Sequence, residues 1–109
     1  MAEKITFDEF KKLELRVAEI LEAVPHPNAD RLYVVTIKIG AEERQVVAGI
    51  RAHYTTEELK GKKVVFVANL EPATIRGVES QGMLLAASND TMLTLVTPER
   101  AIDTGAPVR

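Results

Sequence analysis

The chain has 109 residues, of which 46% are hydrophobic and 28% are charged, and this balance predicts one soluble domain over residues 1–109. It has no cysteine, which excludes disulfides and thiolate metal sites. It has no apolar run of the roughly 18 residues that a membrane helix needs. Residues 1–4 lack the basic start and apolar stretch of a signal peptide, so we expect a cytoplasmic protein without a membrane partner.

The formal net charge is −2, so no global positive field indicates a nucleic-acid partner. The 14 lysine and arginine residues can still form a local basic face, because binding depends on which charges meet phosphates. One candidate is the cluster 60–63, for which a solvated turn is the favoured interpretation. A second is the set Arg31, Lys38 and Arg44, which strand geometry would place on one side of the fold; an ordinary polar face is the alternative.

The N-terminal segment predicts a short helix. Thr6 and Glu9 have the spacing of a capping box, in which each side chain bonds the backbone N–H of the other residue. We therefore expect a helical turn over 7–12, with Phe7 and Phe10 packing inward.

Residues 13–24 fit two interpretations. The residues that share one helical face are Leu13, Val17, Ile20, Leu21 and Val24. This spacing slightly favours a helix. Leu13, Leu15 and Val17 also alternate as in a strand, and a β-bulge near residues 18–19 would return Ile20 to the same face.

The rest of the chain has the pattern of short strands. We expect them at 32–39, 44–50, 63–68, 83–87 and 92–96, with turns at 40–43 and 88–90. A second capping box, Thr55 and Glu58, predicts a one-turn helix that Gly61 ends, just before 63–68, which is the fourth strand when 13–24 is counted as the first. About five strands with a small helix before the fourth indicate an all-β, closed or nearly closed barrel.

The glycine-bounded segment 77–82 fails as a catalytic motif. A nucleophile elbow needs glycine two residues before Ser80, where Val78 stands. A phosphate-binding P-loop needs lysine and then serine or threonine after the second glycine, but Met83 and Leu84 follow. No acid, base or nucleophile constellation remains, so we expect no enzyme and no catalytic residue.

The two histidines, His26 and His53, have no cysteine partner for a metal site. Loop histidines usually have a structural hydrogen-bonding role, and we expect that role here, with no metal and no cofactor. Aromatic residues are also scarce. Phe7, Phe10, Tyr33 and Phe66 stand at expected core positions, and only Tyr54 is left exposed. A general single-strand binder, which stacks bases on exposed aromatics, is therefore disfavoured.

Five sequence blocks between Leu13 and Ala87 carry a family resemblance. They are Leu-Arg-Val-Ala-Glu-Ile at 15–20, His-Pro-Asn-Ala-Asp-Arg-Leu-Tyr at 26–33, Arg-Gln-Val-Val-Ala-Gly-Ile at 44–50, Val-Ala-Asn-Leu at 67–70 and Arg-Gly-Val-Glu-Ser-Gln-Gly-Met-Leu-Leu-Ala at 76–86. In this order they resemble the tRNA-binding domain of the methionyl-tRNA synthetase C-terminal family. Similar domains occur as stand-alone tRNA-binding proteins and in endothelial monocyte-activating polypeptide II.

The resemblance implies a five-stranded OB barrel, so that 13–24 becomes a bulged first strand and not a helix. It implies a non-catalytic module that recognises tRNA shape and backbone. Such a module would support a methionyl-tRNA synthetase, in cis or in trans as a subunit. The expected partners are tRNA, the synthetase catalytic region and, as in many relatives, a second copy of the chain in a homodimer.

The resemblance also implies a set of nucleic-acid-binding residues: Asn28, Arg31, Asn69, Arg76, Ser80 and Met83. Arginines can pair with phosphate, asparagines can bond sugar or phosphate oxygens, and serine can do so weakly. Gly77 and Gly82 fit either a close approach to RNA or plain turn geometry. Many relatives carry basic residues just after the position of Pro72, where this chain has Ala73 and Thr74. We therefore expect weak affinity for tRNA unless a second copy contributes.

Two other functions compete with tRNA binding. A CsaA-like dimeric peptide-binding chaperone resembles the same family and would present an apolar groove. A purely structural dimerisation domain would not depend on Arg31 or Arg76 for any binding.

Overall fold

Strand β1 (Leu15–Pro25) organises the fold, which a computed structural model describes for residues 2–109. Its antiparallel neighbours are β2 (Tyr33–Ile39), β4 (Lys63–Val67) and β10 (Pro107–Val108). The pairing with β2 shifts register between Ile20 and Glu22, so β1 bends there and serves two neighbours. The bulged strand is thus confirmed, with its bulge slightly later than expected. The helix favoured by spacing is wrong, because adjacent Val17 and Ala18 are both buried, as in a strand covered on both faces.

The hairpin of β2 and β3 (Glu42–Ala48) confirms the expected strand pair. Tyr33, Val35 and Ile37 alternate into the core, as their spacing predicts. Gly40 turns the chain between the two strands at a φ of 61°. The core around this hairpin includes the fully buried Phe66 of β4.

Helix α2 (Thr56–Leu59) is the predicted one-turn helix before β4. Both bonds of its capping box are present between Thr55 and Glu58. Its single buried residue, Leu59, is fully enclosed in the core, and Gly61 ends the turn at a φ of 86°. The helix therefore packs one apolar side chain against the barrel and leads directly into β4.

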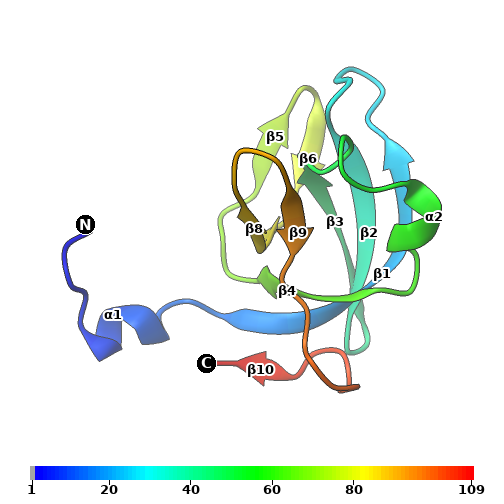
Figure 1. The fold of residues 1–109 in the computed structure, drawn as a ribbon. Coiled ribbons are helices and arrows are strands. Elements are labelled where there is room, and N and C mark those ends of the chain that lie inside the picture. The colour runs from blue at the N-terminus through cyan, green and yellow to red at the C-terminus, as the bar shows by residue number, and fades with distance from the viewer. Residues whose placement is uncertain (1) are drawn as a thin grey trace.

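The chain after β4 forms more elements than expected. A hairpin of β5 (Ala73–Ile75) and β6 (Val78–Ser80) was not predicted. The expected strand 83–87 divides into β7 (Met83–Leu84), which pairs with β4, and β8 (Ala86–Ser88), which pairs with β9 (Leu93–Leu95). The sheet follows the order β3-β2-β1-β4-β7 and curls (Figure 1).

Residues 79–81 close the barrel against the free edge of β3. The backbone N–H of Val47 donates to the Ser80 hydroxyl at 2.9 Å, and that of Gln81 donates to the Gln45 carbonyl at 2.8 Å. The Gln45 side chain donates to the Glu79 carbonyl at 2.8 Å. These bonds satisfy edge groups of β3 that a half-barrel would leave open. The predicted all-β OB barrel is confirmed.

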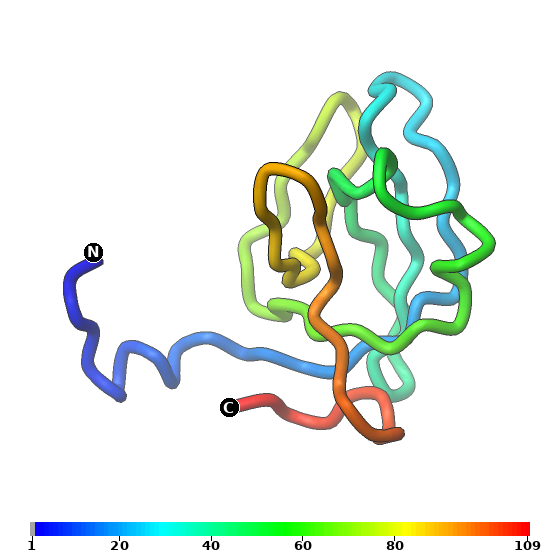
Figure 2. The backbone as a smooth tube through the Cα atoms, viewed as in Figure 1, coloured from blue at the N-terminus to red at the C-terminus, as the bar shows by residue number. Residues whose placement is uncertain are grey.

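An N-terminal arm projects from the barrel (Figure 1). It carries α1 (Phe7–Lys11), whose capping box is present as predicted. Phe7 is 70% exposed and Phe10 is half-buried, so the expectation that both rings pack inward is wrong. The reason is that the arm lies outside the barrel, on the same side as the C-terminal strand β10 (Figure 2). Within residues 2–109, no helix is long and apolar enough to cross a membrane.

Candidate nucleic-acid interface

His26 joins the β1–β2 loop (residues 26–32) to the β5–β6 hairpin. Its ring is 4% exposed. Nδ1 accepts a hydrogen bond from the Asn28 backbone N–H at 2.9 Å, so the ring proton is on Nε2, which donates to the Ile75 carbonyl at 2.9 Å. The predicted structural role of a loop histidine is confirmed for His26. The two segments, 49 residues apart, are thereby held as one unit.

Asn28 makes a second link between the same two segments. Its Nδ2 donates to the Arg76 carbonyl at 3.3 Å, while the side chain stays on the surface. Its Oδ1 is left to accept from a ligand. The loop and the hairpin tip lie together at the same end of the barrel (Figure 1), which we call the loop end.

Arg76 stands at the tip of the β5–β6 hairpin in an unusual backbone conformation. Its φ is 55° and that of Gly77 is 90°, which together make a two-residue type I′ turn. Left-handed backbone costs a non-glycine residue about 1–2 kcal/mol, and such turns favour asparagine or glycine at this position. An arginine held there at that cost is a functional candidate. Gly77 is explained by turn geometry alone.

Arg31 provides a second free cation at the loop end. It is exposed in the β1–β2 loop, beside the exposed Asp30. The ion pairs found within residues 2–109 are Arg16 with Glu14 and Arg44 with Glu42, and neither involves the loop end. Arg31 and Arg76 are therefore not neutralised by a carboxylate contact. An anionic ligand would meet unpaired guanidinium groups there.

The strand register separates Lys38 from Arg44. In the strand register Lys38 lies opposite Glu43 of β3 and Glu19 of β1, on the outer face of the sheet. Arg44 lies opposite Ile37, which is fully buried, so Arg44 is on the inner face. Of the two interpretations left open for Arg31, Lys38 and Arg44, the one-sided basic set is therefore wrong, because neighbouring strand positions alternate between faces. The outer sheet face has carboxylates around its lysine and is not a basic surface.

Arg44, near the start of β3, is held by three internal contacts. Its guanidinium lies 5.9 Å from the centroid of the Phe66 ring, donates to the Ala68 carbonyl at 2.6 Å and bonds Glu42. The hydrogen bond from Arg44, and then its charge, lower the pKa of the Glu42 carboxyl. In the basic cluster 60–63, one lysine has a partner within the protein: the Lys63 ammonium donates a hydrogen bond to the Ile102 carbonyl.

Asn69 and Ser80 have structural partners away from the loop end. Asn69 accepts from the Glu14 N–H at 2.8 Å and donates to the Lys12 carbonyl at 2.6 Å, which fastens the arm to the end of β4. Ser80 is 4% exposed, and its hydroxyl accepts from Val47 and donates to the Gly82 carbonyl at 3.1 Å. Both side chains are occupied, so they shape the barrel and offer little to a ligand.

Met83 lies on a different surface from Arg76. It is 45% exposed and pairs with Val67, which pairs in turn with Leu15, so the three share the outer face of the sheet. The glycine before it, Gly82, has a φ of 137°, and a Cβ there would stand 2.8 Å from the Val67 carbonyl oxygen. Its close approach is to the protein's own strand, not to a ligand.

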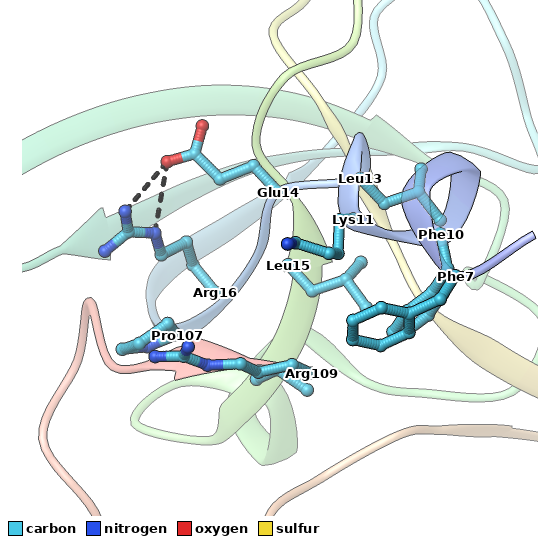
Figure 3. A pocket seen from close by; sticks show the side chains of 10 residues that line it. Phe7, Phe10, Lys11, Leu13, Glu14, Leu15, Arg16, Pro107 and Arg109 are labelled. Carbon is cyan, nitrogen blue, oxygen red and sulfur yellow. Dashed lines mark hydrogen bonds and ion pairs between the residues drawn. The ribbon is translucent and has the colours of Figure 1, made fainter.

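The arm and β10 enclose an apolar groove of about 440 Å³ next to Leu15. Phe7, Phe10, Leu13 and Val108 line it, and the Arg16–Glu14 ion pair borders it (Figure 3). We call this surface, together with Met83, the arm face. Its groove is mainly apolar, although Lys11, Glu14, Arg16 and Arg109 also line it, whereas the loop end presents Arg31 and Arg76.

Of the six predicted residues, the structure brings Asn28, Arg31 and Arg76 together and leaves the other three elsewhere. The sequence analysis missed His26 as the residue that joins the two loops. The Pro-His-Pro-Asn segment at 25–28 was the available sequence signal. Its two prolines restrict the backbone, so the histidine between them stands in a fixed turn. No cluster of three metal-ligating side chains is found over residues 2–109.

The chain is similar to known proteins in sequence and in fold. A family model described as a putative tRNA-binding domain matches residues 15–107. A methionine–tRNA ligase of Thermococcus kodakarensis is 54% identical over 107 residues, which are 98% of this chain and 14% of that protein. The chain therefore spans a small part of the curated relatives that it matches.

Two solved structures share the fold over their full length. A protein of Pyrococcus horikoshii described as MetRS-related superimposes with a TM-score of 0.92 at 36% identity, covering 99% of this chain and 100% of that one. A CsaA chaperone of Picrophilus torridus superimposes with a TM-score of 0.90 at 28% identity, covering 97% and 100%.

Proposed function

Because the chain belongs to the putative tRNA-binding domain family, we propose that it binds tRNA at the loop end and does no chemistry itself. The observation that carries this proposal is the junction of two loops that presents Arg31 and Arg76 without carboxylate partners. Asn28 adds an amide oxygen beside them. Guanidinium groups and amides of this kind contact phosphate and sugar oxygens.

The proposed mode of binding reads the shape and backbone of tRNA. Base stacking needs exposed aromatic platforms. Tyr33 and Phe66 are buried, and the Tyr54 hydroxyl accepts from the Leu95 N–H at 2.9 Å. Tyr54 itself packs against the core. The exposed Phe7 belongs to α1 on the N-terminal arm, apart from the loop end (Figure 1). The phosphate backbone of a folded RNA suits the guanidinium and amide groups of the loop end better than the bases of a single strand do.

We further propose that the module delivers or holds tRNA for a methionyl-tRNA synthetase in the cytoplasm, covalently or as a separate subunit. The basis is that nearly the whole chain matches a small part of much longer methionine–tRNA ligases. The catalytic region of such a ligase is the proposed protein partner. The module's role is affinity, and the chemistry belongs to that region.

The arm face supports a homodimer as part of this proposal. Phe7 is 70% exposed and Leu13 46%, and both line the groove. Met83, 45% exposed, lies on the same outer sheet face as Leu15 of the groove. Contiguous exposed apolar surface favours association, and a second copy of the same face is self-complementary in a twofold dimer. A dimer would carry two loop ends, and their combined binding would raise the avidity for tRNA although each loop end has few basic groups.

A CsaA-like peptide-binding role is the second candidate, because the arm-face groove is apolar and the Picrophilus torridus chaperone shares the fold. The two roles use different surfaces, so they can be separated. The deciding experiment is a gel-shift comparison of folded tRNA, single-stranded RNA and an unfolded peptide. We expect tRNA to be retained most strongly, and retention of the peptide alone would favour the chaperone.

The same assay with Arg31→Gln/Arg76→Gln tests the site. We expect the double variant to fold and to lose most of its tRNA affinity. The wild-type salt slope should be about −0.7 to −0.9 per neutralised phosphate. A double variant that binds like the wild type would place the RNA surface elsewhere.

A further inference from the structure

Arg51 occupies a tight turn that is packed against the loop end. The backbone N–H groups of His53 and Tyr54 both donate to the Ile50 carbonyl, at 3.0 and 3.2 Å, so residues 50–54 form one compact turn. A Cβ added at Gly49 would lie 3.7 Å from the Leu32 side chain, which follows Arg31 directly in the β1–β2 loop. The turn that carries Arg51 is therefore a neighbour of the loop that carries Arg31.

The ring of Tyr33 is a rigid platform under the Arg51 guanidinium. The guanidinium carbon lies 6.0 Å from the ring centroid. Tyr33 is 6% exposed, begins β2 where the β1–β2 loop ends, and donates its hydroxyl to the Tyr54 carbonyl at 2.7 Å. A fixed aromatic face below a cation favours one orientation of the guanidinium. Arg51 is thus held in place while part of its side chain faces solvent.

Arg51 forms no ion pair within residues 2–109, where the ion pairs join Arg16 to Glu14 and Arg44 to Glu42. A half-buried arginine that forms no ion pair retains its positive charge at the surface. With Arg31 and Arg76 it makes three guanidinium groups outside the ion pairs of residues 2–109, against Asp30 in the β1–β2 loop and Glu57 and Glu58 in α2.

We propose that Arg51 is a third phosphodiester-binding residue, preoriented by Tyr33, which extends the RNA surface from the two loops to the β3–α2 turn. This inference rests on the proposed function. Preorientation lowers the side-chain entropy lost on binding, and guanidinium groups can form bidentate contacts with phosphate. A third cation compensates in part for Ala73 and Thr74, which stand where many relatives have basic residues.

Salt-dependent tRNA binding of Arg51→Gln tests the proposal. We expect about a tenfold or greater loss of affinity, and a salt slope that is shallower by about 0.7–0.9. Arg51→Lys keeps the charge but loses the planar guanidinium and its bidentate geometry, so it should retain the slope and lose affinity only about twofold to fivefold. Melting curves verify that each variant is folded, and the Arg51 Nε–H resonance of the wild-type protein should shift when tRNA is added.

Arg100→Gln is the matched control, because it removes the same charge from an exposed residue in the segment that leads to β10. If Arg51→Gln binds like Arg100→Gln while Arg31→Gln/Arg76→Gln loses affinity, the role of Arg51 is wrong and the loop-end proposal stands. If all three bind like the wild type, the loop-end proposal itself fails. An unmoved Arg51 resonance at saturating tRNA would also overturn the inference.

Discussion

The Nε2–H of His26 donates to the Ile75 carbonyl at 2.9 Å and so joins the β1–β2 loop to the β5–β6 hairpin. This bond and the one from Asn28 N–H to Nδ1 use both ring nitrogens of a buried side chain. The relative placement of Arg31 and Arg76 therefore depends on a residue that itself touches no ligand. His26 is a positioning residue for the loop end.

We expect His26→Ala to destabilise the fold by about 2–4 kcal/mol, because it removes a buried side chain and leaves a part-buried carbonyl and N–H without their partner. At a temperature where the variant is folded, tRNA affinity should also fall, since the two loops lose their link. Denaturant unfolding and gel shift measure the two effects. His53→Ala, which changes an exposed histidine, is the control for stability and should leave the free energy of unfolding nearly unchanged. Equal effects of the two substitutions would contradict the linking role.

Replacing Arg76 should separate stability from binding. Arg76→Asn relieves a φ of 55° in a type I′ turn and should raise stability by about 0.5–1 kcal/mol, while it removes a proposed phosphate contact. The expected result is a higher melting temperature together with weaker tRNA binding. Arg76→Lys, which retains both charge and backbone cost, should change melting little. A variant that is more stable and binds equally well would show that Arg76 serves no ligand.

The fold was largely predictable where a residue pattern repeats. Alternation in β2 and the two capping boxes gave the hairpin, α1 and α2, because each signal is local. The β5–β6 hairpin was missed because its strands have three residues each and its turn is Arg-Gly, not the usual Asn-Gly. The barrel itself followed from family resemblance, since periodicity alone favoured a helix for β1.

The candidate site was predictable only in part. Sequence identifies which side chains carry suitable groups, but not which of them the fold already uses. Asn69 binds Glu14 across 55 residues and Ser80 binds Val47 across 33, so their roles depend on tertiary closure. Likewise, apolar spacing in α1 does not show whether Phe7 faces the chain's own core or another molecule.

Ser80→Ala should act on stability and not on RNA. The substitution leaves the Val47 N–H without its acceptor at the closure of the barrel, which costs about 1–3 kcal/mol. Once the folded fraction is corrected for, tRNA affinity should equal that of the wild type. Chemical denaturation and binding at low temperature test this. A specific loss of affinity in a fully folded Ser80→Ala protein would restore Ser80 as an RNA-contacting residue.

Gly82→Ala should be far more disruptive than Gly40→Ala. Both glycines have positive φ, at 137° and 61°, but a Cβ at Gly82 would stand 2.8 Å from the Val67 carbonyl, whereas Gly40 has nothing within 4 Å. We expect about 1 kcal/mol for Gly40→Ala and more than about 2 kcal/mol for Gly82→Ala. Unfolding midpoints measure the difference. Similar midpoints would mean that the approach of Gly82 to β4 is not tight in solution.

Phe7→Ser tests whether the arm face joins two copies. A side chain that is 70% exposed contributes little to the stability of a monomer, but its loss from an apolar interface costs about 1.5–3 kcal/mol per copy. We therefore expect sedimentation velocity to show a dimer for the wild type and a concentration-dependent shift to monomer for Phe7→Ser. Met92→Ser removes an apolar side chain of 60% exposure from the β8–β9 hairpin and should remain dimeric. A wild-type monomer, or equal behaviour of the two variants, would contradict the arm face as a dimer interface. The proposal that avidity compensates for weak tRNA contacts would then fail as well.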